Sequence, residues 1–338
     1  MQTFTHHSSV TYIPDTDANS YILLDIETTG LSPEYAAVFM IGCGYYENQC
    51  FHTIHWLADA YDIKNEQDVL ANFTTWFLTQ ISKHSDLKLV TYNGQQFDLP
   101  FLKKRFEQCH LMCPLDESNH FHSMDYFRTI SKTKHLWPLK NTKLHTIADW
   151  LGYHSSKTPS GRQLIKTYHS YIKTKDPALL NLLFLHNIDD LEALSTVISI
   201  DKYFNFFNKD WQNHEITKTN ECLSIHIQLD ENHHFPVELN LEKYGFRIDL
   251  KANHVWIHIP LYPNGLRYYY RDINNYVYLP AEDHVLHKSM SKYIDKSHYV
   301  KATAETCYTW FQPDHHFFKE SDKQQAYIQM ILELLGLF

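Results

Sequence analysis

The sequence lacks the features of a membrane-spanning or secreted chain. It has no run of about eighteen uncharged apolar residues, the length that a transmembrane helix needs. Its opening residues, MQTFTHHSSVTYIPD, carry neither the basic flank nor the apolar stretch of a secretory signal. Repeats and low-complexity tracts are also missing. We therefore expect a cytoplasmic protein that does not contact a membrane.

Cysteine is scarce, with 6 residues spread over 338, which argues against a disulfide framework and suits reduced thiols. One cluster of possible zinc ligands does occur: Cys109 and Cys113 are followed by His120 and His122. This spacing matches no structural zinc pattern well, so a zinc site is the weaker interpretation of these residues.

Positive charge is in deficit, with 30 Lys and Arg against 39 Asp and Glu and a formal net charge of −9. A nucleic acid would therefore need a local basic patch or bound cations. Two segments are candidates for such a patch: Lys103-Lys104-Arg105, and the run 266–271, in which two arginines flank three tyrosines. A solvated helix face explains the first equally well, and an ordinary β-strand explains the second more simply.

The chain is long enough for two domains of ordinary size, which we place at 1–205 and 206–338, and its texture changes from about Cys222. In residues 1–205, strand-like and helical segments alternate, which is typical of a mixed α/β domain. We expect strands at 21–26, 37–46, 50–57, 87–93 and ending near 125, and helices at 65–83, at 98–109 and from 177 onward, with a turn at 157–161.

Residues 206–338 predict a β-rich α+β domain with antiparallel strands. The expected strands are 223–229, 236–241, 245–250, 254–260, 266–272 and 276–280, followed by helices at 283–293 and 325–338. Nothing in this segment predicts a chemical role, and a part in substrate binding or dimerisation is a hypothesis from its position alone.

Two acidic residues lie together on the first predicted strand. Side chains alternate along a strand, so Asp25 and Glu27 point to one face while Leu24 and Ile26 point to the other. Adjacent carboxylates repel unless a cation neutralises them, and oxygen ligands suit Mg²⁺ or Mn²⁺. Taken alone, this pattern is also that of a surface strand.

Two later segments carry further candidates. Asp98 begins a predicted helix, a position where aspartate is also a common capping residue. His186 and Asp190 are four residues apart on another predicted helix, so they share one face. Asp189 lies off that line, which makes Asp190 the preferred metal ligand, with His186 placed to orient a water molecule.

Together these segments resemble a known family. DIETTGL at 25–31, YNGQQFDLPFL at 92–102 and HNIDDLEAL at 186–194 are similar to the three motifs of the DEDD superfamily of 3′→5′ exonucleases. Its members share a DnaQ-like, ribonuclease-H-like fold, and the YprB-like branch is the most similar. The resemblance extends over about residues 18–201 and implies an α/β domain with a mixed central sheet flanked by helices.

The resemblance also implies a set of site residues. Asp25, Glu27, Asp98 and Asp190 match the four ligands of two divalent cations, Mg²⁺ or Mn²⁺, about 4 Å apart, that act on a phosphodiester. Relatives place Tyr four residues, or His five residues, before the last aspartate. His186 stands at the four-residue spacing and is therefore a hybrid of the two patterns.

Substrate contacts are expected around the first two motifs. By resemblance, Thr28, Thr29 and Leu31 lie against the terminal nucleotide, and Asn93 helps to hold the strand and the substrate. Phe97 is a candidate for stacking on a base, whereas core packing is the preferred interpretation of Phe101.

The sequence therefore predicts a 3′→5′ exonuclease acting on DNA or RNA, with protein partners undetermined. Two alternatives stay open. One is a binding or scaffold protein that keeps the fold without catalysis, although none of the four motif acids is missing. The other is an endonuclease that uses the same metals, and an open groove rather than a closed end would distinguish it.

Overall fold

The computed structural model describes residues 1–8, 14, 18–116, 121–155, 161–207, 214–219 and 221–336. The chain forms two compact units, Met1–Ile200 and Asp201–Phe338. No described helix combines the length and the apolar character needed to cross a bilayer.

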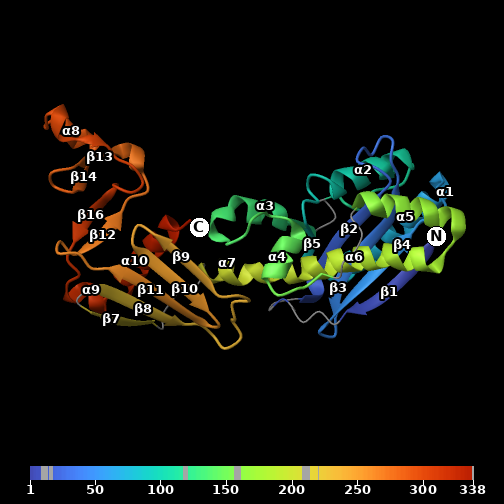
Figure 1. The fold of residues 1–338 in the computed structure, drawn as a ribbon, viewed down its shortest axis with the longest axis horizontal. Coiled ribbons are helices and arrows are strands. Elements are labelled where there is room, and N and C mark those ends of the chain that lie inside the picture. The colour runs from blue at the N-terminus through green and yellow to red at the C-terminus, as the bar shows by residue number, and fades with distance from the viewer. Residues whose placement is uncertain are drawn as a thin grey trace. The chain divides into compact units, whose positions relative to one another are not determined.

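A six-stranded mixed sheet forms the centre of the first unit (Figure 1). In spatial order its strands are β1 (Gln2–Ser8), β4 (Cys50–Leu57), β3 (Val38–Glu47), β2 (Tyr21–Thr28), β5 (Leu87–Thr91) and β6 (Phe121–Asp125). The first four pair antiparallel, while β5 and β6 continue the sheet parallel to β2. The expected mixed sheet is confirmed.

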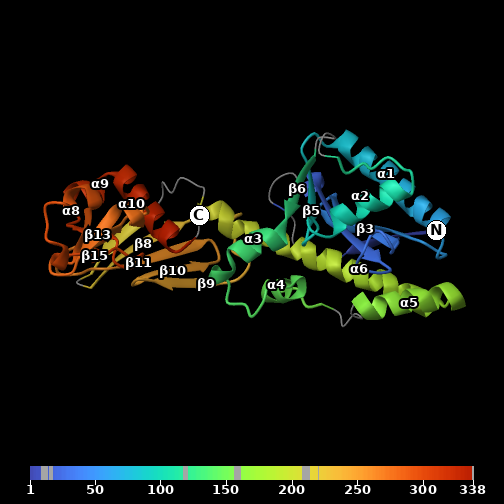
Figure 2. The ribbon, with the colours of Figure 1, turned by 90° about the horizontal axis from the view of Figure 1, so that it is seen from above.

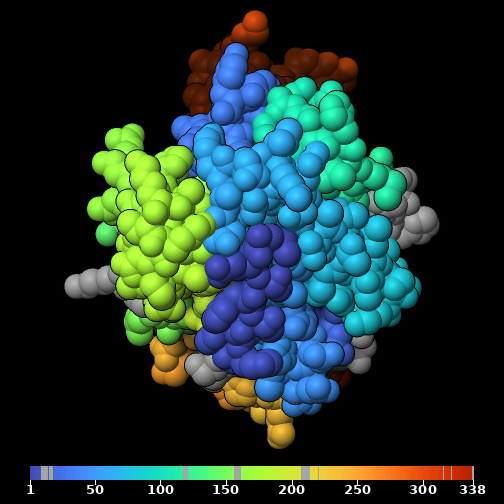
Figure 3. Space-filling model, turned by 90° about the vertical axis from the view of Figure 1, so that its right-hand side faces the viewer, coloured from blue at the N-terminus to red at the C-terminus, as the bar shows by residue number. Residues whose placement is uncertain are grey.

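Strand β1 was not expected from the sequence. Most of its side chains are exposed or half-buried, so it lacks the apolar alternation that marks a strand. It pairs along its whole length with β4 and forms one edge of the sheet. Figure 3 shows it in dark blue on the surface, beside the yellow-green helices.

Helices cover both faces of this sheet (Figure 2). Helix α1 (Ile63–Lys83) packs on β3 and β4 and buries one apolar stripe, Val69, Leu70, Phe73 and Phe77. Helix α6 (Pro177–Val197) packs on β2 and β3, and α4 (Leu144–Trp150) and α5 (Gly161–Thr174) pack on α6. The side chain of Asp176 caps α6 by accepting from the Ala178 amide, 2.8 Å away.

Two shorter helices follow the parallel strands. Helix α2 (Asp98–Gln108) begins soon after β5, and α3 (Tyr126–Lys132) follows β6 directly. Because β2 lies beside β5, the start of α2 comes next to the acidic end of β2. Of the turn expected at 157–161, only Gly161 is among the described residues, and it begins α5.

The second unit begins with α7 (Asp201–Phe207) and is rich in strands, as expected. Its antiparallel five-stranded sheet has the order β7 (His214–Lys218), β8 (Cys222–Gln228), β11 (His254–Pro260), β10 (Phe246–Lys251) and β9 (Leu239–Lys243). Two smaller sheets consist of β12 (Leu266–Tyr269) with β16 (Tyr308–Phe311), and of β14 (His284–His287), β13 (Tyr276–Leu279) and β15 (Val300–Lys301). Helices α9 (His315–Lys319) and α10 (Ser321–Leu334) close the unit.

The prediction of a helix at 283–293 is wrong for the first half of that range. Residues His284–His287 form β14, which pairs with β13, and helix α8 covers only Lys288–Ser291. Asp283 explains the difference, since its positive φ of 52° turns the chain back on itself and its carboxylate accepts from the Tyr278 hydroxyl.

The run of arginines and tyrosines at 266–271 forms an ordinary strand, β12, followed by a turn. Arg267 lies over the rings of Tyr262, Tyr308 and Trp310 at 4.4, 4.3 and 4.8 Å from the ring centroids. Arg271 forms an ion pair with Glu333. Both arginines therefore have partners within the unit, which weakens the hypothesis of a nucleic-acid-binding run.

Candidate metal centre

Strand β2 presents two carboxylates to helix α6. The Asn187 side-chain amide donates to Asp25 Oδ2 over 2.6 Å, and His186 Nε2 lies 3.5 Å from Glu27 Oε1. Ile26, between the two acids, and Leu24, before Asp25, are buried in the core. The register with β3 shifts at Glu27 and Thr28, which marks an irregularity beside the acids.

Helix α2 brings a third carboxylate to this strand. Asp98 is the first residue of the helix, is only 7% exposed, and accepts a hydrogen bond from the Ile26 amide over 3.2 Å. The preceding turn is tied to β6, because Asp125 accepts from the amides of Asn93 and Gln95 over 2.9 and 3.1 Å. Asp125 thus positions the second motif, a role that its place in the sequence did not indicate.

Helix α6 supplies the fourth acid. Ligand atoms of Glu27, His186 and Asp190 all lie within 4.8 Å of one another, and His186 Nε2 is 3.6 Å from Asp190 Oδ2. The neighbouring Asp189 instead accepts from the Tyr153 hydroxyl over 2.8 Å. Of the two candidates on this helix, Asp190 therefore lies with the other acids.

Burial and mutual repulsion make three of these acids, Asp25, Glu27 and Asp98, hard to ionise. Burial, followed by the charges of Asp190 and its neighbours, raises the pKa of Asp25 and of Glu27 well above the usual range. Burial raises the pKa of Asp98 to about 7, although the Ile26 amide opposes the shift. No lysine or arginine in the described part of the chain forms an ion pair with the four acids, so histidines are the basic side chains that face them there.

This donor set suits a divalent cation. Carboxylate oxygens are the ligands that Mg²⁺ and Mn²⁺ prefer, and an imidazole nitrogen is compatible with Mn²⁺. A bound cation would also relieve the repulsion that raises the pKa values of Asp25 and Glu27. The acidic groups gathered at β2 and α6 can therefore hold a metal ion.

His145 belongs to this site but was missed in the sequence. It lies on α4, and its Nε2 is 2.6 Å from Asp190 Oδ1 and 3.9 Å from Asp189 Oδ2. The hydrogen bond to Asp190 raises the pKa of the His145 imidazole. Its Nδ1 is buried without a hydrogen-bond partner among the described residues. No local spacing links residue 145 to residue 190, so only the packing of α4 on α6 identifies it.

The residues expected to contact substrate fall into two groups. Thr28 and Thr29 stabilise the turn after β2, since Thr28 Oγ1 donates to the Gly30 carbonyl over 2.8 Å and Thr29 Oγ1 accepts from the Ala37 amide over 2.9 Å. Leu31, at the tip, is 86% exposed.

Asn93 and Phe97 flank the start of the second motif. Asn93 takes a positive φ of 67°, and its side-chain Oδ1 is buried without a hydrogen-bond partner in the part of the chain that the structure describes. Phe97 is half-buried and packs against Phe101, with ring centroids 5.5 Å apart, and Phe101 itself lies in the core as expected. Of the two, Asn93 has an unsatisfied atom to offer a ligand.

Two hypotheses from the sequence lose support. Arg105 makes a paired contact with buried Glu66, at 2.7 and 2.6 Å, rather than offering its charge to a phosphate. In the suggested zinc group, His122 pairs with Asp86 at 3.2 Å, and His120 lies outside the described residues. Cys109 and Cys113 are in no group of possible metal ligands in the described ranges.

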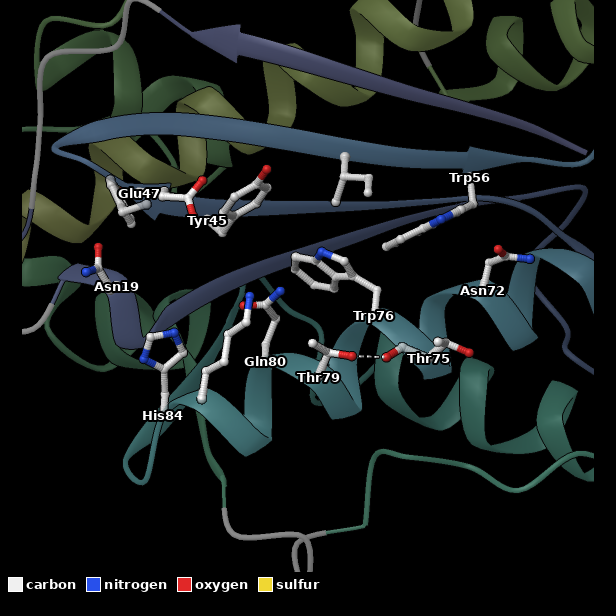
Figure 4. Close-up of a pocket in the computed structure, with 13 residues that line it drawn as sticks. Asn19, Tyr45, Glu47, Trp56, Asn72, Thr75, Trp76, Thr79, Gln80 and His84 are labelled. Atoms are coloured by element: carbon white, nitrogen blue, oxygen red, sulfur yellow. Dashed lines mark hydrogen bonds between the residues drawn. The ribbon is translucent and has the colours of Figure 1, made fainter.

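A separate cavity of about 610 Å³ opens between α1 and strands β3 and β4 (Figure 4). Its walls include the rings of Tyr45, Trp56 and Trp76. It contains none of the acids described above, because Asp25 and Glu27 face α6 and the cavity faces α1.

Of the comparisons with known proteins, the family match agrees with the fold. A family model described as the RNase_H superfamily matches residues 22–200. An uncharacterized protein, YprB of Bacillus subtilis strain 168, is 29% identical over 189 residues, which are 54% of this chain and 42% of that protein. The chain thus matches less than half the length of this relative. Among solved structures, the family B DNA polymerase of the hyperthermophilic archaeon Pyrobaculum calidifontis aligns with 94% of this chain and 46% of its own, at 12% identity and a TM-score of 0.49.

Proposed function

Because the chain belongs to the RNase_H superfamily, we propose that its first unit is a metal-dependent nuclease, acting as a 3′→5′ exonuclease on DNA or RNA. One observation carries the proposal. Four acids from three distant segments, Asp25 and Glu27, Asp98, and Asp190, repel one another in a partly buried site where no described lysine or arginine pairs with them.

The proposed chemistry is hydrolysis of a phosphodiester bond. Two divalent cations, Mg²⁺ or Mn²⁺, held by Asp25, Glu27, Asp98 and Asp190, would supply an activated water and stabilise charge on the leaving 3′ oxygen. The same cations supply the local positive field that a chain of net charge −9 lacks for a polyanionic substrate.

His186 is the proposed water-orienting residue. Its Nε2 is 3.5 Å from Glu27 and 3.6 Å from Asp190, so it faces the space where an attacking water would lie. His145 lies at the other oxygen of Asp190. Its Nε2 contacts Asp190 Oδ1, whereas Asp190 Oδ2 lies on the side of His186. We assign His145 to positioning that carboxylate.

The proposed substrate-binding residues lie in the sequence motifs that carry the acids. Exposed Leu31, on the turn that Thr28 and Thr29 stabilise, is proposed to contact the terminal nucleotide. The unpartnered Asn93 Oδ1 is proposed to accept from the substrate, and Phe97 to border the base.

The test is hydrolysis of single- and double-stranded DNA and RNA, labelled at the 5′ or the 3′ end, with Mg²⁺ or Mn²⁺. A 5′-labelled strand should shorten progressively, and Asp25→Ala should abolish this without unfolding the protein. His186→Ala should lower turnover by about 10²-fold or more and change metal affinity little. Internal cuts would instead indicate an endonuclease, and binding without any cleavage would indicate the silent binding protein.

A further inference from the structure

A row of three residues crosses the central sheet beside the candidate site. Asp25 on β2 pairs in register with Gly42 on β3, and Gly42 pairs with His55 on β4. Paired residues share a face, so all three look toward α6. Neighbouring strands are about 4.8 Å apart, which separates Asp25 and His55 by roughly 10 Å and prevents direct contact.

The missing side chain of Gly42 lets a residue of α6 bridge that gap. A Cβ atom at Gly42 would lie 1.7 Å from Asn187 Oδ1 and 2.7 Å from Asn187 Cγ, closer than atoms can approach. It would also lie 3.1 Å from His55 Nδ1. Asn187 therefore occupies the space that any other residue at position 42 would fill.

The hydrogen bonds of the bridge have a single consistent direction. A carboxylate that holds a cation can only accept, so the Asn187 amide donates to Asp25 Oδ2, 2.6 Å away. Asn187 Oδ1 then faces His55, whose Nδ1–H donates to it over 2.8 Å. Burial lowers the pKa of the His55 imidazole to about 4, so the ring is neutral and its Nε2 accepts from the Thr53 hydroxyl at 2.8 Å.

The described surroundings of this chain of hydrogen bonds are closed to solvent and include aromatic rings. Thr53, His55 and Asn187 are each 0% exposed. The ring of Phe184 lies 5.9 Å from the His55 ring, and that of Phe4 lies 6.2 Å away. Within such apolar walls, a polar group that loses its partner cannot bond to water instead, so each residue fixes the orientation of the next.

We propose that Thr53, His55 and Asn187 are positioning residues that fix the Asp25 carboxylate for cation binding, and that Gly42 is the residue that makes room for them. The inference rests on the proposed metal-dependent function. The bond from Asn187 occupies Oδ2 and leaves Oδ1 for the cation. Outer partners of this kind commonly contribute about 10- to 100-fold to metal affinity.

The experiment measures Mn²⁺ binding to the full-length chain without nucleic acid, from the electron paramagnetic resonance signal of free Mn²⁺. Two variants form a matched pair. The side-chain amide of His55→Asn can replace Nδ1–H, whereas that of His55→Gln reaches toward Thr53 and leaves Asn187 without its donor. We expect His55→Gln to weaken Mn²⁺ binding about 10- to 100-fold and His55→Asn to recover most of the affinity.

The outcomes separate positioning from simple support of the fold. Equal losses in both variants, or no loss in either, would overturn the positioning proposal while the metal site stands. Wild-type protein that binds no Mn²⁺ would remove the proposed function itself and this inference with it. Circular dichroism checks that each variant is folded. Should either be unfolded, Thr53→Val, which removes only the hydroxyl, decides the matter: weaker Mn²⁺ binding supports the chain of hydrogen bonds, and unchanged binding overturns it.

Discussion

Two carboxylate sites in the first unit, one fully and one partly buried, are built in opposite ways. Glu66, on α1, is 3% exposed and receives two hydrogen bonds from Arg105 and a third from the Val38 amide, 2.9 Å away. Arg105 is itself fixed by the Pro33 carbonyl at 3.0 Å. This site is complete, because a buried negative charge is balanced by a bidentate cation of the same chain.

The acids around β2 have no such partner. Asp25, Glu27 and Asp98 have raised pKa values, while among the described residues their neighbours are other acids, amides and histidines rather than lysine or arginine. Folding that gathers unpaired charges costs stability. The comparison teaches that burial alone does not identify a functional acid, whereas burial without a counter-charge indicates a place for an external cation.

The largest effect should come from neutralising one acid of the unbalanced site. Asp98→Asn keeps the acceptor for the Ile26 amide and removes one ligand charge. Divalent cations supply several kcal/mol to such reactions, so we expect hydrolysis of a labelled oligonucleotide to fall by about 10³-fold or more. The free energy of unfolding without metal should stay the same or rise at pH 8.

Glu66→Gln is the matched control, because it neutralises the acid of the balanced site. It should lower the free energy of unfolding and leave Mn²⁺ affinity unchanged. If Asp98→Asn retained full activity, Asp98 would not be a metal ligand, and the contrast between the two sites would lose its functional meaning.

The second-largest effect should come from removing Arg105, the cation of the balanced site. Arg105→Met leaves Glu66 buried and unpaired, and breaking a buried ion pair in this way costs about 3–5 kcal/mol. Urea denaturation of the metal-free protein measures the loss. Adding Glu66→Gln to Arg105→Met should recover most of it, since no buried charge then remains without a partner.

Mn²⁺ affinity should be the same in the wild type and in both of these variants. A large drop in affinity would mean that the pair supports the metal site rather than the fold. A loss below about 1 kcal/mol would mean that water reaches Glu66 and that the pair behaves like a surface ion pair.

Which acids lie side by side could be predicted in part from local signals, whereas their choice as metal ligands came from the resemblance of three motifs to a family. Alternation along a strand placed Asp25 and Glu27 on one face, and the four-residue spacing placed His186 and Asp190 together. What balances or orients them could not be predicted. His145 lies 45 residues from Asp190, and Asn187 reaches His55 across 132 residues. Such pairs have no fixed spacing, so only the packing of α4 on α6, and of α6 on the sheet, brings them together.

The fold shows the same division between local and distant signals. Strands with buried apolar alternation, such as β8 and β11, were found near their true bounds. Edge strand β1 and the short strand β14 were not, since each depends on pairing with a partner strand more than on its own pattern. In the basic run at 103–105, the pairing of Arg105 with Glu66 could not be foreseen for a related reason, because Glu66 lies on another helix.

The smallest effect is the pH dependence of stability, which should differ between the two sites. The pKa of Asp98 rises from 3.8 to about 7, so the folded state keeps a proton that the unfolded state releases. This contribution to stability is complete below about pH 4 and is lost as the pH rises through 7, with a slope of at most about 1.4 kcal/mol per pH unit for one proton. Urea denaturation of the metal-free protein between pH 5 and 8 should therefore show a decline that Asp98→Asn reduces and Glu66→Gln does not. An identical decline in both variants would mean that the acids around β2 ionise as easily as exposed ones, and the absence of a counter-charge would no longer distinguish their site from that of Glu66.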